Sequence, residues 1–254
     1  LPPWTTLLVA SADPKPGPRG ETGHIDYGIR AWGQHFRSQL IDTGRVQSFS
    51  DLQLRCLETG FPIRDRPDAQ PVKPHVLCID AGGGVNFYEE EESEESAGVR
   101  ANAVYSFAFR DGELAKQDPR IVPVRGFGGK KKMQEPWRER SIAWRVKGKQ
   151  TYYLNWLLVN PDDNKDILDY LIHVARGDEE EPPNDYWDVH SDIDETYIAQ
   201  MTAEQRQLYQ GVWRWMPISE PANNDYWDIE YYSCAIARKF GADTRKPLED
   251  LHPT

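Results

Sequence analysis

Near its start the chain reads Thr5-Thr6-Leu7-Leu8-Val9-Ala10-Ser11-Ala12-Asp13-Pro14, a run of apolar and small residues that ends in an aspartate and a proline. Such an unbroken run is typical of a strand that is buried on both faces of a sheet. Apolar and polar residues alternate over residues 24–32, and a third strand is expected over residues 36–42. Because these segments follow one another closely, we expect an antiparallel meander.

A second apolar run, residues 75–79, ends at Asp80 and is followed by glycines. Further strands are expected over residues 121–124 and 152–159, and Trp213-Arg214-Trp215-Met216 is expected in the core or in a packed strand. We expect helices at 48–60, 101–110, 162–175, 195–210 and 224–240. This order predicts an α/β fold with a mixed antiparallel and parallel central sheet flanked by helices.

The composition restricts the class of protein. The 254 residues suffice for a large domain with a sizeable core, and the first residue, Leu1, suggests a fragment or a processed piece. With 41 acidic and 30 basic residues, the formal charge of −11 argues against a protein that coats nucleic acid, since such proteins are usually basic. No apolar run approaches the ~18 residues of a membrane helix, and no basic segment precedes residues 7–10 as in a signal peptide. Three widely spaced cysteines favour a reducing compartment over a disulfide framework or a zinc ribbon.

Three aspartates stand where such a fold could bring them together. Asp13 and Asp80 each end an apolar run, and ligand sites in α/β sheets collect at the carboxyl ends of strands. Asp228 follows about one turn into the last expected helix. Adjacent carboxylates repel one another unless a cation neutralises them, and oxygen ligands suit Mg²⁺ or Mn²⁺. Two such ions ~3.5–4 Å apart can hold both the attacking water and the leaving oxygen of a phosphodiester.

Each aspartate also has a structural interpretation. Asp13 and Asp80 are followed by proline or glycines and can be turn residues. Asp228 can be a first-turn acid that the helix dipole favours. The pattern alone therefore leaves both interpretations open.

Seven short motifs occur in a fixed order along nearly the whole chain: LVASAD at 8–13, IDYGIRAWG at 25–33, CIDAG at 78–82, AVY at 103–105, VRGFGG at 124–129, YIAQMTAE at 197–204 and NDYWDIEYY at 224–232. In order and spacing they resemble the C-terminal nuclease domain of phage terminase large subunits, in the lambda-like GpA branch. On this resemblance the catalytic and metal-binding acids of the family fall on Asp13, Asp80 and Asp228.

The resemblance implies a single RNase H-like nuclease domain over residues 1–254. It implies two divalent metal ions, Mg²⁺ or Mn²⁺, and hydrolysis of double-stranded DNA to start and end genome packaging. The implied partners are an ATPase motor in the same polypeptide, the small terminase subunit and the portal, with no membrane, in the host cytoplasm at the procapsid. No GxxxxGK[ST] loop occurs, so the motor is not in these residues.

The chain departs from the family pattern in three places. An acidic insertion lies near residues 87–98, Asp225 stands where the family usually has Glu, and Trp227 stands where it has a small aliphatic residue. All three departures leave the three aspartates intact.

The densest basic region is the segment 130–149. We expect it to grip the DNA backbone without reading the sequence, because lysines on phosphates carry no base information. The candidate DNA-binding residues are Lys130, Lys131, Lys132, Arg138 and Arg140. An equally open interpretation is a solvated loop or hairpin face.

Several alternatives remain at this stage. Asp192, Asp194 or Glu230 could replace Asp228 as the third acid, and Asp26 could support the site from the second strand. The same fold could serve an RNase H-like resolvase or recombinase, or a non-catalytic module that docks a protein through its acidic surface.

Overall fold

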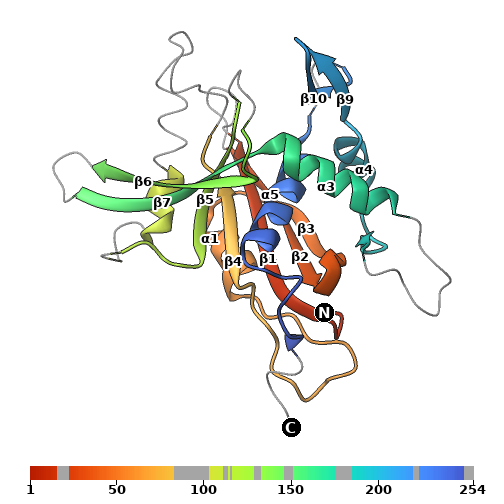
Figure 1. Ribbon diagram of the computed structural model, residues 1–254. Coiled ribbons are helices and arrows are strands. Elements are labelled where there is room, and N and C mark those ends of the chain that lie inside the picture. Colours follow the sequence, from red (N-terminus) through yellow and green to blue (C-terminus); the bar gives the residue numbers. More distant parts are fainter. Residues whose placement is uncertain are drawn as a thin grey trace.

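The structure, a computed structural model, describes residues 1–15, 23–82, 103–110, 114, 116–128, 133–145, 151–174, 185–219 and 223–248. Its centre is an eight-stranded sheet in the order β6-β7-β5-β4-β1-β2-β3-β8 (Figure 1). The strands are β1 Thr5–Lys15, β2 His24–Gly33, β3 Ser38–Val46, β4 Val76–Asp80, β5 Ile121–Gly126, β6 Trp137–Arg145, β7 Thr151–Val159 and β8 Trp187–Asp188. The named helical segments are η1 Gln34–Phe36, α1 Phe49–Gln53, η2 Leu54–Glu58, α3 Pro161–His173, α4 Glu195–Met201 and α5 Asp225–Lys239. Residues 103–108, within the predicted helix at 101–110, are also helical.

The strand pairing confirms the predicted architecture. β1, β2 and β3 form the antiparallel meander, while β4 lies parallel to β1 on its other side. β5 and β7 continue in parallel, and β6 closes the edge antiparallel to β7. This mixed sheet with flanking helices is an α/β fold of the RNase H-like kind.

β1 is longer than predicted. It runs through Asp13-Pro14 to Lys15, whereas its pairing with β4 covers only Val9–Ala12. A proline lacks an amide hydrogen and is tolerated where a strand has lost one of its neighbours. The strand therefore brings Asp13 level with Asp80, the last residue of β4, and carries Lys15 beyond the end of β4.

The predicted helix over residues 195–210 is wrong in its second half. α4 ends at Met201, and a separate hairpin follows, made of β9 Glu204–Tyr209 and β10 Val212–Pro217. Gln210 and Gly211 have φ of 49° and 79°, which is the backbone that closes a tight two-residue hairpin. In Figure 1 this hairpin stands apart from the central sheet, beyond α3.

Two other elements refine the prediction. The part of the basic segment that the structure describes contains the strand β6. β6 pairs with β7, so this part is a hairpin face and not a loop. The Trp213–Met216 stretch lies in β10, with Trp215 packed on Trp227 at 5.2 Å between ring centroids, but Trp213 is 59% exposed and not in the core.

The core lies on both faces of the sheet. Leu8, Ala10 and Ala12 of β1 face α1 and η2, while Leu7 and Val9 face α3 and α5. Burial of alternate residues on both faces explains the unbroken apolar run. Truncating a fully buried leucine such as Leu8 to alanine costs about 2–5 kcal/mol.

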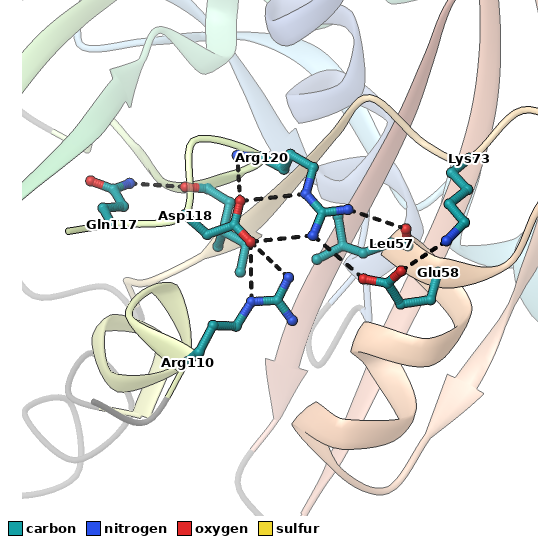
Figure 2. Close-up of polar contacts among 8 residues, drawn as sticks. Leu57, Glu58, Lys73, Arg110, Gln117, Asp118 and Arg120 are labelled. Carbon is teal, nitrogen blue, oxygen red and sulfur yellow. Dashed lines mark hydrogen bonds and ion pairs between the residues drawn. The ribbon is translucent and has the colours of Figure 1, made fainter. Parts of the chain in front are cut away.

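A chain of ion pairs ties η2 to the start of β5 (Figure 2). The Asp118 carboxylate accepts hydrogen bonds from Arg110 at 2.7 Å and from Arg120 at 3.4 Å, and Arg120 continues to Glu58. Lys73 then donates to Glu58 at 3.0 Å. Asp118 is only 6% exposed, so this network belongs to the framework of the fold.

The remaining sequence expectations concern cysteines and membranes. Cys56, Cys78 and Cys234 are buried and free. In the described part of the chain, no helix is both long and apolar enough to cross a membrane.

Candidate functional site

Asp13 and Asp80 occupy neighbouring positions on parallel strands. The register pairs Ser11 with Cys78 and Ala12 with Ile79, so the next residues, Asp13 and Asp80, come side by side. Strands in a sheet are about 4.8 Å apart. Cys78 donates to Ser11 Oγ at 3.0 Å, which marks the face that Asp13 and Asp80 share. Both aspartates are buried at the end of this face, 2% and 8% exposed.

The first turn of α5 brings Asp228 to the same end of the sheet. Asp228 lies one turn before Tyr232, whose hydroxyl donates to Asp80 Oδ1 at 3.4 Å. Burial raises the pKa of Tyr232, and the negative charges of Asp80, Asp228 and Asp13 raise it further. All three predicted aspartates are therefore near enough to Tyr232 to raise its pKa.

Lys15 links Asp13 to a fourth acid. Its Nζ lies 2.7 Å from Asp13 Oδ2 and also forms an ion pair with Asp225, the first residue of α5. Asp225 is 2% exposed. Burial opposes the charged form, but the two carboxylates raise the pKa of Lys15 above its usual value.

Lys165 links Asp228 to a fifth acid. Its Nζ lies 2.8 Å from Asp228 Oδ1 and donates to both oxygens of Glu204 at 3.0 and 2.9 Å. The Lys165 and Glu204 side chains are each 6% exposed. Asn224 also donates to Glu204 and, at 3.5 Å, to Asp228 Oδ2. Lys165 comes from α3 and Glu204 from the hairpin, so this cluster joins three elements to the site.

Burial and neighbouring charges shift the pKa values of Asp228 and Lys165. Burial raises the pKa of Asp228 to about 6, and Glu204 and Asp13 add to the rise while Lys165 opposes it. Burial by itself lowers the pKa of Lys165, but Asp228 and Glu204 outweigh it and raise the value. Lys15 and Lys165 thus each contact two carboxylates of the site, and a group of acids this close attracts cations.

The donor chemistry fits a hard divalent cation. The acids offer only oxygen ligands, which such cations prefer. Among the described residues, no three His, Cys, Asp or Glu side chains are arranged as a ready-made metal site. Binding a metal therefore requires side-chain adjustment around Lys15 and Lys165.

The alternative acids have structural partners elsewhere. Glu230 is 1% exposed and accepts two hydrogen bonds from Arg30 and one from Tyr197. Asp194 caps α4 by accepting from the Tyr197 amide, and Asp192 is an exposed acceptor for Ser191. Asp26 lies opposite Asp13 in the register but accepts from Arg45 at 2.8 and 3.2 Å. These contacts favour Asp228 as the third acid.

The predicted DNA-binding residues are only partly visible. Lys130, Lys131 and Lys132, like the acidic insertion near residues 87–98, lie outside the described residues. Arg138 and Arg140 are exposed on β6, and Arg138 donates to Glu135 at 2.8 Å. β6 is three strands away from β4, about 14 Å along the sheet.

Sequence reasoning missed Lys15, Lys165 and Glu204 as members of the site. Glu204 had a signal, because it ends the motif YIAQMTAE, but that motif was placed inside a helix. Lys15 stands two residues after Asp13, the spacing that puts both side chains on one face of a strand. Lys165 had no signal, since a lysine in a helix is usually exposed.

Comparison with known proteins identifies the family of the chain. Searches of the curated proteins and of the solved structures gave no significant match. Residues 1–248 match the family model of the terminase large subunit gpA, endonuclease domain. The chain therefore belongs to the endonuclease-domain family of the phage DNA-packaging terminase large subunit gpA.

Proposed function

We propose that this nuclease domain hydrolyses double-stranded DNA in a reaction that depends on divalent metal, and that the cuts start and end genome packaging. The observation that supports the proposal is that Asp13 and Asp80 end adjacent parallel strands, while Tyr232, one turn after Asp228, donates a hydrogen bond to Asp80. Two-metal phosphodiester hydrolysis requires such a set of carboxylates.

Asp13, Asp80 and Asp228 would hold two Mg²⁺ or Mn²⁺ ions. When bound, such ions lower the pKa of a bound water and stabilise charge on the leaving oxygen. Asp80 is oriented by the Gly82 amide, which donates to Oδ1 at 3.0 Å, and by the Tyr232 hydroxyl. Asp228 is held in place by Lys165, and Asp13 by Lys15. The chain thus keeps the acids in place by ion pairs that a metal can exchange.

DNA contacts are part of the same proposal. Arg138 and Arg140 on β6, together with Lys130, Lys131 and Lys132, would contact the phosphate backbone. The proposed partners are the ATPase motor, the small terminase subunit and the portal, and the proposed place of action is the procapsid in the host cytoplasm. Family membership supports them.

A nicking assay tests the catalytic assignment. Asp13→Asn, Asp80→Asn and Asp228→Asn should each abolish the cutting of supercoiled plasmid in Mg²⁺ or Mn²⁺, since each removes one carboxylate from the set. Asp192→Asn is the matched control, because this aspartate is exposed and lies outside the cluster. A variant that cuts at the wild-type rate would remove its residue from the proposed site.

A further inference from the structure

The buried lysine of the site divides its contacts unequally between two carboxylates. Lys165 Nζ donates hydrogen bonds to both Glu204 oxygens, at 3.0 and 2.9 Å. Asp228 Oδ1 lies 2.8 Å from the same Nζ as an ion pair, so Glu204 takes two contacts of this ammonium group and Asp228 takes one. An ammonium group has three N–H donors, and here two of them point to Glu204.

This division matters because a buried lysine competes with a metal for a carboxylate. An ammonium group that donates directly to a buried aspartate forms a strong charge-assisted hydrogen bond. A second carboxylate that takes these hydrogen bonds weakens the lysine's hold on the first. Glu204 has the geometry for this role, since its side chain is 6% exposed and both of its oxygens face Lys165.

We propose that Glu204 is a positioning residue that shares the Lys165 ammonium group by two hydrogen bonds and so lets a divalent cation replace Lys165 at Asp228 Oδ1. The inference rests on the proposed function. It assigns a role to the hairpin, because Glu204 is the first residue of β9 and connects the hairpin to α5 through Lys165.

The first test replaces Glu204 by glutamine. Gln keeps the shape and an oxygen for Asn224, but it loses the charge that holds Lys165. Lys165 should then settle on Asp228, and the Mn²⁺ concentration at half-maximal rise in melting temperature should increase about 10-fold to 100-fold. The measurement uses the domain without DNA, and plasmid nicking at saturating DNA should show the same Mn²⁺ dependence.

The second test adds Lys165→Met to Glu204→Gln. Removing the ammonium group removes the competitor, so the double variant should need less Mn²⁺ than Glu204→Gln alone. A merely structural role for Glu204 predicts the opposite, because a second core substitution then adds to the damage. Circular dichroism and the metal-free melting temperature show whether each variant is folded.

Glu58→Gln is the matched control, since Glu58 also accepts from a lysine, Lys73, at 3.0 Å but in the ion-pair chain of η2. It should leave the Mn²⁺ midpoint unchanged. A wild-type midpoint in Glu204→Gln, or a double variant that needs as much Mn²⁺ as Glu204→Gln or more, would overturn the inference. A wild-type domain whose melting temperature ignores Mn²⁺ would instead overturn the metal-dependent function, and the inference with it.

Discussion

Arg30 and Glu230 form a buried two-point ion pair that joins β2 to α5. Arg30 Nε lies 2.6 Å from Glu230 Oε2, and Nη2 lies 3.1 Å from Oε1. The two side chains are 1% and 2% exposed. Tyr197 of α4 donates to the same carboxylate at 2.8 Å, so one glutamate fixes α4 and α5 against the sheet. Because Glu230 lies two residues after Asp228 in α5, the ion pair also holds the part of the helix that carries Asp228.

Glu230→Gln should destabilise the domain by about 3–5 kcal/mol, because it leaves a buried guanidinium group without its counter-charge. Urea unfolding followed by circular dichroism measures the change. Glu135→Gln is the control, since its pair with Arg138 is exposed and screened by solvent, so this variant should keep the stability of the wild type. A loss below about 1 kcal/mol in Glu230→Gln would show that the pair does not anchor α5.

The fold was largely predictable because its strands have strong local patterns. The unbroken apolar run at 5–12 is typical of a strand buried on both faces, and the alternation at 24–32 is typical of a second strand. The structure confirms the antiparallel meander that they predict. The error at 195–210 arose where a short helix runs into a hairpin, since the turn at Gln210-Gly211 depends on backbone geometry that composition does not specify. For β6 the sequence offered a hairpin face only as one of several interpretations. β6 is an edge strand with exposed basic residues, so it lacks the apolar pattern of a buried strand.

The site was predictable only in part. Strand ends predicted Asp13 and Asp80, the first turn of the last helix predicted Asp228, and the family motifs pointed to the same three residues. The lysines that neutralise them come from a strand end and from a distant helix, and such pairing is a property of tertiary packing. Lys165 and Glu204 are 39 positions apart, and an ion pair between residues so far apart produces no pattern in the sequence.

Mn²⁺ should stabilise the domain against heat, and above the Kd the stabilisation should rise with the logarithm of the Mn²⁺ concentration, because a ligand that binds only the folded state adds about 2.7 kcal/mol at 100 times its Kd. Asp80→Asn should abolish this increase, as it removes a carboxylate from the centre of the cluster. Differential scanning fluorimetry across a Mn²⁺ series measures both. Ca²⁺-free buffer and the Asp192→Asn variant serve as controls, and an equal shift in Asp80→Asn and wild type would contradict the prediction.

Asp118→Asn should cost about 1.5–3 kcal/mol, since Asp118 accepts charge-assisted hydrogen bonds from Arg110 and Arg120 in the network of Figure 2. Burial by itself raises the pKa of Asp118, but these hydrogen bonds lower it overall. The stabilisation is therefore present at neutral pH and is lost as the pH falls through the lowered pKa. Chemical unfolding at pH 7 and below pH 4 tests this. The wild type should lose more stability on acidification than Asp118→Asn.

His75 should make the domain less stable in mild acid. Its Nδ1 accepts a hydrogen bond from the Leu8 amide at 3.1 Å, at the middle of the central strand, and this requires the unprotonated nitrogen. Burial lowers the pKa of His75 below its usual 6.5 and outweighs the backbone contact with Leu8, which raises it, while Arg245 adds to the decrease. The unfolded chain therefore binds the proton first, and stability falls as the pH drops below about 6.5.

The measurement is the free energy of unfolding of the wild type and of His75→Asn between pH 8 and pH 5. Asn offers an oxygen to the Leu8 amide but does not titrate, so the variant should show a shallower pH dependence over this window. His173→Asn is the control, because that histidine is 73% exposed on α3. If wild type and His75→Asn lose stability in parallel, the proton is taken up elsewhere and the hydrogen bond to Leu8 is not the acid-sensitive contact of the sheet.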